Sequence, residues 1–140
     1  MPEIPVIASI APLAAQSDVW FLDIWGVLHN GVKPFASTVD ACLRFRGQGG
    51  TVILVSNAPR PAESVVAQLQ RIDVDAAAYD GVVTSGDVSI TLVEAARDKN
   101  ILHIGPERDR GLFAALPAPP AAGAADCDVA VCTGLYDDDT

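Results

Sequence analysis

The feature that most constrains the fold is an apolar segment that ends in a single acidic residue. Residues 19–22 read VWFL, and residues 23–31 read DIWGVLHNG, so that Asp23 stands between an apolar run and a glycine-containing stretch. This order is typical of a buried parallel strand that delivers one carboxylate to the carboxyl edge of a sheet. Because open α/β folds bind their ligands at that edge, the pattern marks Asp23 as a candidate functional residue.

Short apolar segments alternate with helical segments along the whole chain. The expected strands are 19–22, 51–55, 79–83, 101–104 and 128–132. The expected helices are 9–16, 36–46, 61–71, 84–98 and 109–116, and the proline-rich stretch 117–123 is expected to be a loop. Such alternation predicts βαβ units and a largely parallel sheet, so the expected fold class is α/β.

The composition fits one folded domain and excludes some partners. The chain has 140 residues, of which 50% are hydrophobic and 19% are charged, with a formal net charge of −9. Non-specific binding to nucleic acid or to an anionic membrane needs a basic face, so neither is expected. A phosphorylated small molecule is compatible, because a metal ion can reverse the sign of the charge in a local site.

The sequence indicates neither a membrane segment nor a disulfide framework. No apolar run approaches the ~18 residues of a membrane-spanning helix. Residues 1–16 lack the basic region of a signal peptide, so the cytoplasm is the expected compartment. Cys42, Cys127 and Cys132 form no CxxC pair, which predicts neither disulfides nor a zinc site. They are expected to be ordinary buried thiols.

The surroundings of Asp23 favour a chemical role. A carboxylate at the end of an apolar strand is expected to be partly desolvated, and Mg²⁺ is a suitable partner because it prefers carboxylate oxygens. Such a carboxylate can also attack phosphorus and form an aspartyl-phosphate. From its position alone Asp23 could equally cap a helix or a turn. Gly26 and Gly31 favour function, because glycines allow tight turns and a close approach of the backbone to a ligand.

Residues 23–31 resemble motif I of the haloacid-dehalogenase-like (HAD) hydrolases, whose aspartate is a nucleophile toward phosphate. The string is similar to the class IIA branch, which contains sugar-phosphate and nitrophenyl-phosphate phosphatases, and to an uncharacterised subgroup with the form DIWGVLHNG. The resemblance covers about residues 18–137 and implies a Rossmann-like HAD core with an inserted α/β cap. It implies that Asp23 is the nucleophile and a Mg²⁺ ligand, and that Trp25 binds the metal through its backbone carbonyl.

Trp25 departs from the family motif, which has a second aspartate at this position. In HAD phosphatases that aspartate protonates the leaving oxygen and then activates water. An indole cannot do either, because its N–H does not usefully titrate, so we expect phosphoryl capture to survive while turnover suffers. His29 in the same loop is a candidate substitute acid or base. The alternative is a surface or hydrogen-bonded loop histidine.

The second apolar strand, residues 51–55, is followed by Ser56 and Asn57. This order resembles motif II of the same branch and implies that Ser56 and Asn57 bind phosphate or orient Asp23. A hydroxyl and the backbone N–H groups after it are suitable donors for phosphoryl oxygens. The alternative is a local role, in which Ser56 caps the next helix and Asn57 forms an Asx-turn.

Two further segments resemble the class IIA pattern. Residues 84–87 read TSGD, which in that branch leads to the cap, although Thr84 or Ser85 is equally explained as the N-cap of a helix. The segments 104–107 and 131–135 look like the first two strands of the cap.

The resemblance implies only the N-terminal part of such an enzyme. The expected domains are residues 1–86, the first half of the core, and residues 87–140, the start of the cap. The family's motif III lysine and motif IV acids would follow the cap, and Lys33 and Lys99 match neither context. The acidic run 137–139 is better interpreted as a solvated terminus. We therefore expect weak or absent catalysis, and association between copies through exposed strand edges.

The predicted function is that of a Mg²⁺-dependent phosphatase of small phosphorylated metabolites, acting through an aspartyl-phosphate. The alternative is a catalytically degenerate HAD fold that binds a phosphorylated ligand or a partner protein. A flavodoxin-like or dinucleotide-binding domain is disfavoured, because no GxGxxG string follows the first strand.

Overall fold

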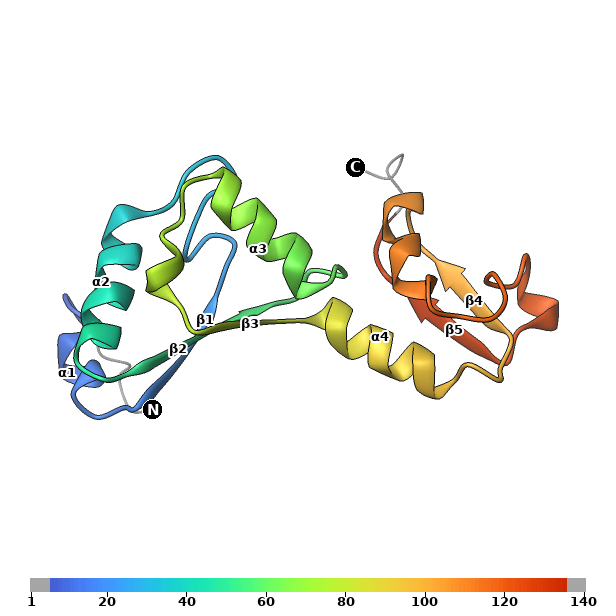
Figure 1. Ribbon diagram of the computed structural model, residues 1–140, viewed down its shortest axis with the longest axis horizontal. Coiled ribbons are helices and arrows are strands. Elements are labelled where there is room, and N and C mark those ends of the chain that lie inside the picture. The colour runs from blue at the N-terminus through green and yellow to red at the C-terminus, as the bar shows by residue number, and fades with distance from the viewer. Residues whose placement is uncertain (1–5, 136–140) are drawn as a thin grey trace. The chain divides into compact units, whose positions relative to one another are not determined.

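The computed structural model describes residues 6–135 (Figure 1). The chain divides into two compact units. One unit extends to Leu54 and includes Ile72–Gly81, and the other comprises Val55–Arg71 and the described residues from Val82 onward. The acidic run 137–139 lies outside the described residues, and the expected domain boundary after residue 86 stays a prediction.

Helices and strands alternate along the chain, as the sequence predicts. In order they are α1 (Ala11–Ala14), β1 (Val19–Asp23), α2 (Ala36–Gly47), β2 (Thr51–Ser56), α3 (Ala62–Arg71), η1 (Ala76–Ala78), β3 (Gly81–Thr84), α4 (Ser85–Ala95), β4 (Ile101–Ile104), η2 (Glu107–Phe113), η3 (Ala124–Asp126) and β5 (Val129–Cys132), where η marks a 3₁₀ helix. Strands β1, β2 and β3 form one sheet in that order, and β4 pairs with β5 in parallel. The expected α/β class is confirmed. No helix within residues 6–135 has the length and apolar character needed to span a membrane.

The first unit is packed around β2 and α2. In β2, Val52 and Leu54 are fully buried, and the residue between them is half-buried. In α2, Cys42 and Phe45 are buried at the three-residue spacing of one helix face. Burial raises the pKa of the Cys42 thiol, which fits the expectation of an ordinary buried cysteine.

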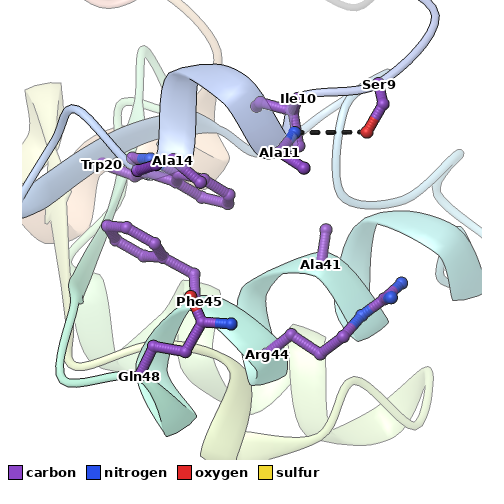
Figure 2. Close-up of a pocket in the computed structure, with 10 residues that line it drawn as sticks. Ser9, Ile10, Ala11, Ala14, Trp20, Ala41, Arg44, Phe45 and Gln48 are labelled. Carbon is purple, nitrogen blue, oxygen red and sulfur yellow. Dashed lines mark hydrogen bonds between the residues drawn. The ribbon is translucent and has the colours of Figure 1, made fainter.

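A cavity of about 280 Å³ opens between α1 and α2 in this unit (Figure 2). The rings of Trp20 and Phe45 stack at its edge, with centroids 4.0 Å apart and an angle of 5° between the planes. The rest of its lining comes mainly from α1 and α2, and none of it from residues 24–31. The cavity is therefore a packing feature between two helices, separate from the candidate site.

The second unit contains a smaller core between α4, the β4–β5 pair and η2. Val93, Ile101, Leu112 and Phe113 form its buried cluster. The parallel pairing places Ile101 opposite Val129 and continues through Ile104 opposite Cys132. The segment expected as a helix over 109–116 is instead the 3₁₀ helix η2.

The expectation that all three cysteines are buried is wrong for two of them. Cys127 is half-buried and Cys132 is exposed. Along β5 exposed and half-buried residues alternate, with Val129 and Val131 on the more buried face. Because side chains alternate between the two faces of a strand, Cys132 falls on the outer face.

Strand β3 begins at Gly81, two residues later than expected, and the 3₁₀ helix η1 and Asp80 precede it. The Arg46 guanidinium donates to both carboxylate oxygens of Asp80, at 2.9 Å to Oδ2 and 2.6 Å to Oδ1. Arg46 also donates to the carbonyl of Ala77. The same carboxylate accepts the backbone N–H of Val52 at 2.8 Å. These contacts connect α2, β2 and the turn before β3.

This network predicts an acid-sensitive contribution to stability. The hydrogen bond from Arg46 and then that from Val52 lower the pKa of Asp80 below its ordinary value of 3.8. The carboxylate therefore stabilises the fold above that value, and the contribution is lost as the pH falls through the lowered pKa of the folded state. We expect the urea midpoint of the wild-type chain to fall more steeply below about pH 4 than that of Asp80→Asn. Parallel midpoint curves for the two proteins would contradict the network.

Candidate active site

The candidate site begins at Asp23, the last residue of β1. Its side chain is exposed, and its Oδ1 accepts the backbone N–H of Ile24 at 2.7 Å. Ile24 itself is only 3% exposed and anchors the start of the following loop. The expectation that the Asp23 carboxylate is partly desolvated is wrong for the described chain, because the strand ends with this residue at the surface.

The loop after Asp23 is folded tightly by its own backbone. The carbonyl of Ile24 accepts the N–H groups of Leu28 at 2.8 Å and His29 at 3.2 Å, and Gly26 N–H donates to the carbonyl of His29 at 2.8 Å. Gly26 has a φ of +80°, which L-residues with a side chain rarely adopt. Leu28 is completely buried and holds the loop against the first unit. The loop is thus a fixed turn rather than an extended connection.

Trp25 lies in this loop with 70% of its surface exposed. Its indole Nε1 is 3.5 Å from the position that a Cβ on Gly31 would occupy. The indole therefore lies against the glycine at the end of the loop. An indole N–H is a donor that does not titrate, so this side chain supplies neither a general acid nor a general base.

His29 is a hydrogen-bonded loop histidine, as the alternative interpretation of this residue predicts. Its side chain is buried and does not lie on the surface. It is 2% exposed, and its Nδ1 accepts the backbone N–H of Gly31 at 2.8 Å. Burial lowers the pKa of His29, so the imidazole is neutral at pH 7, with its proton on Nε2. The sequence analysis did not predict that His29 is buried. The only sign of it in the local sequence is the apolar neighbour Leu28.

Ser56 and Asn57 stand at the carboxyl end of β2, the strand next to β1 in the sheet order. Ser56 is half-buried, and its Oγ accepts the N–H of Ala58 at 3.1 Å. Asn57 is exposed. Ser56 therefore shapes the turn directly after the strand. Among residues 6–135 its hydroxyl proton has no acceptor, so it is available to another group.

The TSGD segment holds the loop that follows Asn57. Thr84 is the N-cap of α4, since its Oγ1 accepts the N–H of Asp87 at 3.1 Å, which confirms the capping interpretation. The same hydroxyl donates to the carbonyl of Arg60 at 2.7 Å. Asp87 Oδ1 accepts the N–H of Ala62 at 3.1 Å. Sequence reasoning identified the cap but not these cross-links.

Gly86 completes this contact between the two segments. Its N–H donates to the carbonyl of Ala58 at 3.1 Å. A Cβ at Gly86 would lie 2.3 Å from the carbonyl oxygen of Arg60, closer than any non-bonded contact allows. The glycine is therefore required by the close approach of two backbones.

The donor set around Asp23 suits a hard cation. Within residues 6–135, no three histidine, cysteine or acidic side chains gather into a closed metal site. An exposed carboxylate and a main-chain carbonyl are oxygen donors of the kind that Mg²⁺ prefers, and Mg²⁺ usually keeps several waters. Asp23 and the main-chain carbonyl of Trp25 supply oxygen donors of this kind, and a Mg²⁺ site formed by them is a proposal.

The comparison with protein families agrees with this geometry. The sequence profile described as haloacid dehalogenase-like hydrolase matches residues 20–116, which include Asp23, Ser56 and the TSGD segment. The chain belongs to the haloacid dehalogenase-like hydrolases. The Rossmann-like HAD core expected from the sequence is thereby confirmed together with the fold.

A solved structure supports the same assignment of this HAD-like hydrolase. The crystal structure of a hydrolase of the haloacid dehalogenase-like family from Brucella suis 1330 is 41% identical, with a TM-score of 0.83. The similarity covers 96% of this chain and 51% of that chain, so this chain spans about half the length of its structural relative. No curated protein matches.

Proposed function

We propose that this HAD-like hydrolase is a Mg²⁺-dependent phosphatase of the class IIA branch that acts on small phosphorylated metabolites. The observation that carries the proposal is the exposed Asp23 at the carboxyl end of β1, followed at once by a tightly folded glycine loop. This is where an open α/β sheet places its chemistry. Hydrolases of this superfamily generally use Mg²⁺.

In the proposed reaction, Asp23 is the nucleophile. One of its carboxylate oxygens forms a bond to phosphorus while the bond from phosphorus to the substrate oxygen breaks, and the leaving alcohol takes up a proton. Water then attacks the aspartyl-phosphate, releasing phosphate and restoring the carboxylate. Asp23 and the Trp25 carbonyl would hold Mg²⁺, which when bound would offset the negative charge of the phosphoryl group.

Ser56 and Asn57 are the proposed phosphate-binding residues. Support for this role comes from their position after β2, the neighbour of β1 in the sheet, and from the free hydroxyl proton of Ser56. The cross-links from Thr84 and Gly86 to the backbone between Ala58 and Arg60 would keep this loop in place.

A specific observation favours a second candidate function. Trp25 stands where the family carries its acid and base, and His29 is buried with its Nδ1 already bonded. A module that binds a phosphorylated ligand or a partner protein without turnover would tolerate both features. As for partners, the net charge of −9 disfavours nucleic acid and an anionic membrane. A small phosphorylated substrate, a cytoplasmic location and self-association are parts of the proposal.

Steady-state phosphatase assays test the proposed function. We expect slow, Mg²⁺-dependent release of phosphate from p-nitrophenyl phosphate or from a sugar phosphate, and we expect Asp23→Asn to abolish it. The matched control is Asp18→Asn, which alters another exposed aspartate just before the same strand and should keep the activity. Activity that persists in Asp23→Asn would contradict the assignment. Binding of a phosphorylated ligand without turnover would support the binding module instead.

A further inference from the structure

His29 occupies a central place in the loop, although the proposed reaction gives it no role. Its backbone forms a parallel bridge with Trp25 and an antiparallel bridge with Pro34. Its carbonyl accepts the N–H of Gly26, and its own N–H donates to the carbonyl of Ile24. The residue therefore connects the beginning, the middle and the end of the loop.

The His29 side chain adds a contact that the backbone cannot supply. Nδ1 accepts the N–H of Gly31 at 2.8 Å, two residues further along the chain. Gly31 has a φ of +89°, a conformation that favours glycine and that residues with a side chain rarely adopt. With only 2% of His29 exposed, this bond is shielded from competing water.

Gly31 in turn sets the surroundings of Trp25. The indole Nε1 lies 3.5 Å from where a Gly31 Cβ would be, so the position of this glycine defines the surface against which the indole rests. A chain of contacts thus runs from the His29 ring through Gly31 to Trp25.

We propose that His29 is a positioning residue that acts as a hydrogen-bond acceptor and not as a proton-transfer group: its Nδ1 fixes Gly31 and thereby the loop that carries Trp25 beside Asp23. The structural part of this inference stands on the loop contacts, whereas its consequence for phosphoryl capture rests on the proposed function. A proton-transfer residue needs a ring nitrogen that reaches substrate or water. Nδ1 is occupied, and Nε2, which carries the proton, belongs to a side chain that is only 2% exposed.

Two substitutions of His29 distinguish a role as hydrogen-bond acceptor from a role in proton transfer. In His29→Asn the amide Oδ1 can take the place of Nδ1 as acceptor, but the side chain cannot act as an acid or base at neutral pH. In His29→Leu a side chain of similar bulk fills the space without an acceptor. The matched pair therefore tests the hydrogen bond at nearly constant packing.

The first readout is nuclear magnetic resonance of the ¹⁵N-labelled chain. We expect a through-hydrogen-bond coupling between the Gly31 amide nitrogen and His29 Nδ1 in the wild-type protein, a measurement that needs no variant. We also expect amide hydrogen exchange at Gly31 to stay near the wild-type rate in His29→Asn and to rise about tenfold in His29→Leu. A protonated Nδ1, or equal exchange rates in the two variants, would overturn the positioning role.

The second readout is Mg²⁺-dependent binding of fluoroberyllate, together with phosphate release. We expect His29→Asn to retain both at near wild-type level and His29→Leu to weaken both by about tenfold. Loss of turnover in His29→Asn with the Gly31 amide still protected would overturn the proposal, since His29 would then transfer protons. If the wild-type chain itself binds no fluoroberyllate, the proposed function fails, while the exchange data still decide whether His29 positions the loop.

Discussion

Replacing Trp25 by aspartate is expected to raise the rate of phosphate release from a sugar phosphate by about 10²- to 10⁴-fold. A sugar alkoxide is a poor leaving group, and the aspartyl-phosphate is hydrolysed slowly unless a base activates water. Neither Trp25 nor the bonded Nδ1 of His29 supplies an acid or base. An aspartate at position 25 would restore both proton transfers.

The folding cost of this substitution is small, so the experiment reports on chemistry. Trp25 is 70% exposed and the loop is held by Ile24 and Leu28, which the substitution leaves unchanged. Trp25→Asn is the matched control, because it removes the indole and introduces a polar side chain without an ionisable group. Equal rates in Trp25→Asp and Trp25→Asn would contradict the expected role of an acid and base at this position.

Gly86→Ala is expected to destabilise the protein by about 2 kcal/mol, a roughly thirtyfold shift in the folding equilibrium. The added Cβ would lie 2.3 Å from the Arg60 carbonyl oxygen and 2.4 Å from its carbonyl carbon. Backbone atoms cannot rotate away as a side chain does, so the contact costs about 3 kcal/mol, the upper end of the range for overpacking. The higher helix propensity of alanine offsets about 1 kcal/mol of this.

Urea denaturation of Gly86→Ala measures this effect, with Gly47→Ala as the control. Gly47 is also helical, at the end of α2, and no atom lies within 4 Å of the position that a Cβ on this glycine would occupy. We expect Gly47→Ala to leave the free energy of unfolding unchanged or slightly higher. A Gly86→Ala protein as stable as Gly47→Ala would mean that the TSGD segment and the loop after β2 do not approach closely in solution.

Elements marked by strong local signals could be predicted from the sequence. The strand at 101–104 is predicted to the residue, because a mostly apolar run stands between Asn100 and the Gly105-Pro106 turn. The strand that ends at Asp23 and the cap at Thr84 also follow from local patterns. In each case the residues that decide the structure are neighbours in the chain.

Features that depend on distant residues could not be predicted in this way. Asp80, just before β3, pairs with Arg46, which lies 34 positions away. The burial of His29 and the close approach of Gly86 to Arg60 are likewise set by packing between segments. The hydrophobic pattern or motif of one segment does not show which distant segment will pack against it.

The most direct test of the central claim is calorimetric titration of the chain with fluoroberyllate in the presence and absence of Mg²⁺. Fluoroberyllate imitates a phosphoryl group bonded to a carboxylate, so its binding reports on Asp23 without requiring turnover. We expect saturable, Mg²⁺-dependent binding that Asp23→Asn abolishes and Asp18→Asn retains. Undiminished binding in Asp23→Asn, or no binding to a wild-type chain shown to be folded, would contradict the assignment of Asp23 as the nucleophile of a phosphoryl-transfer site.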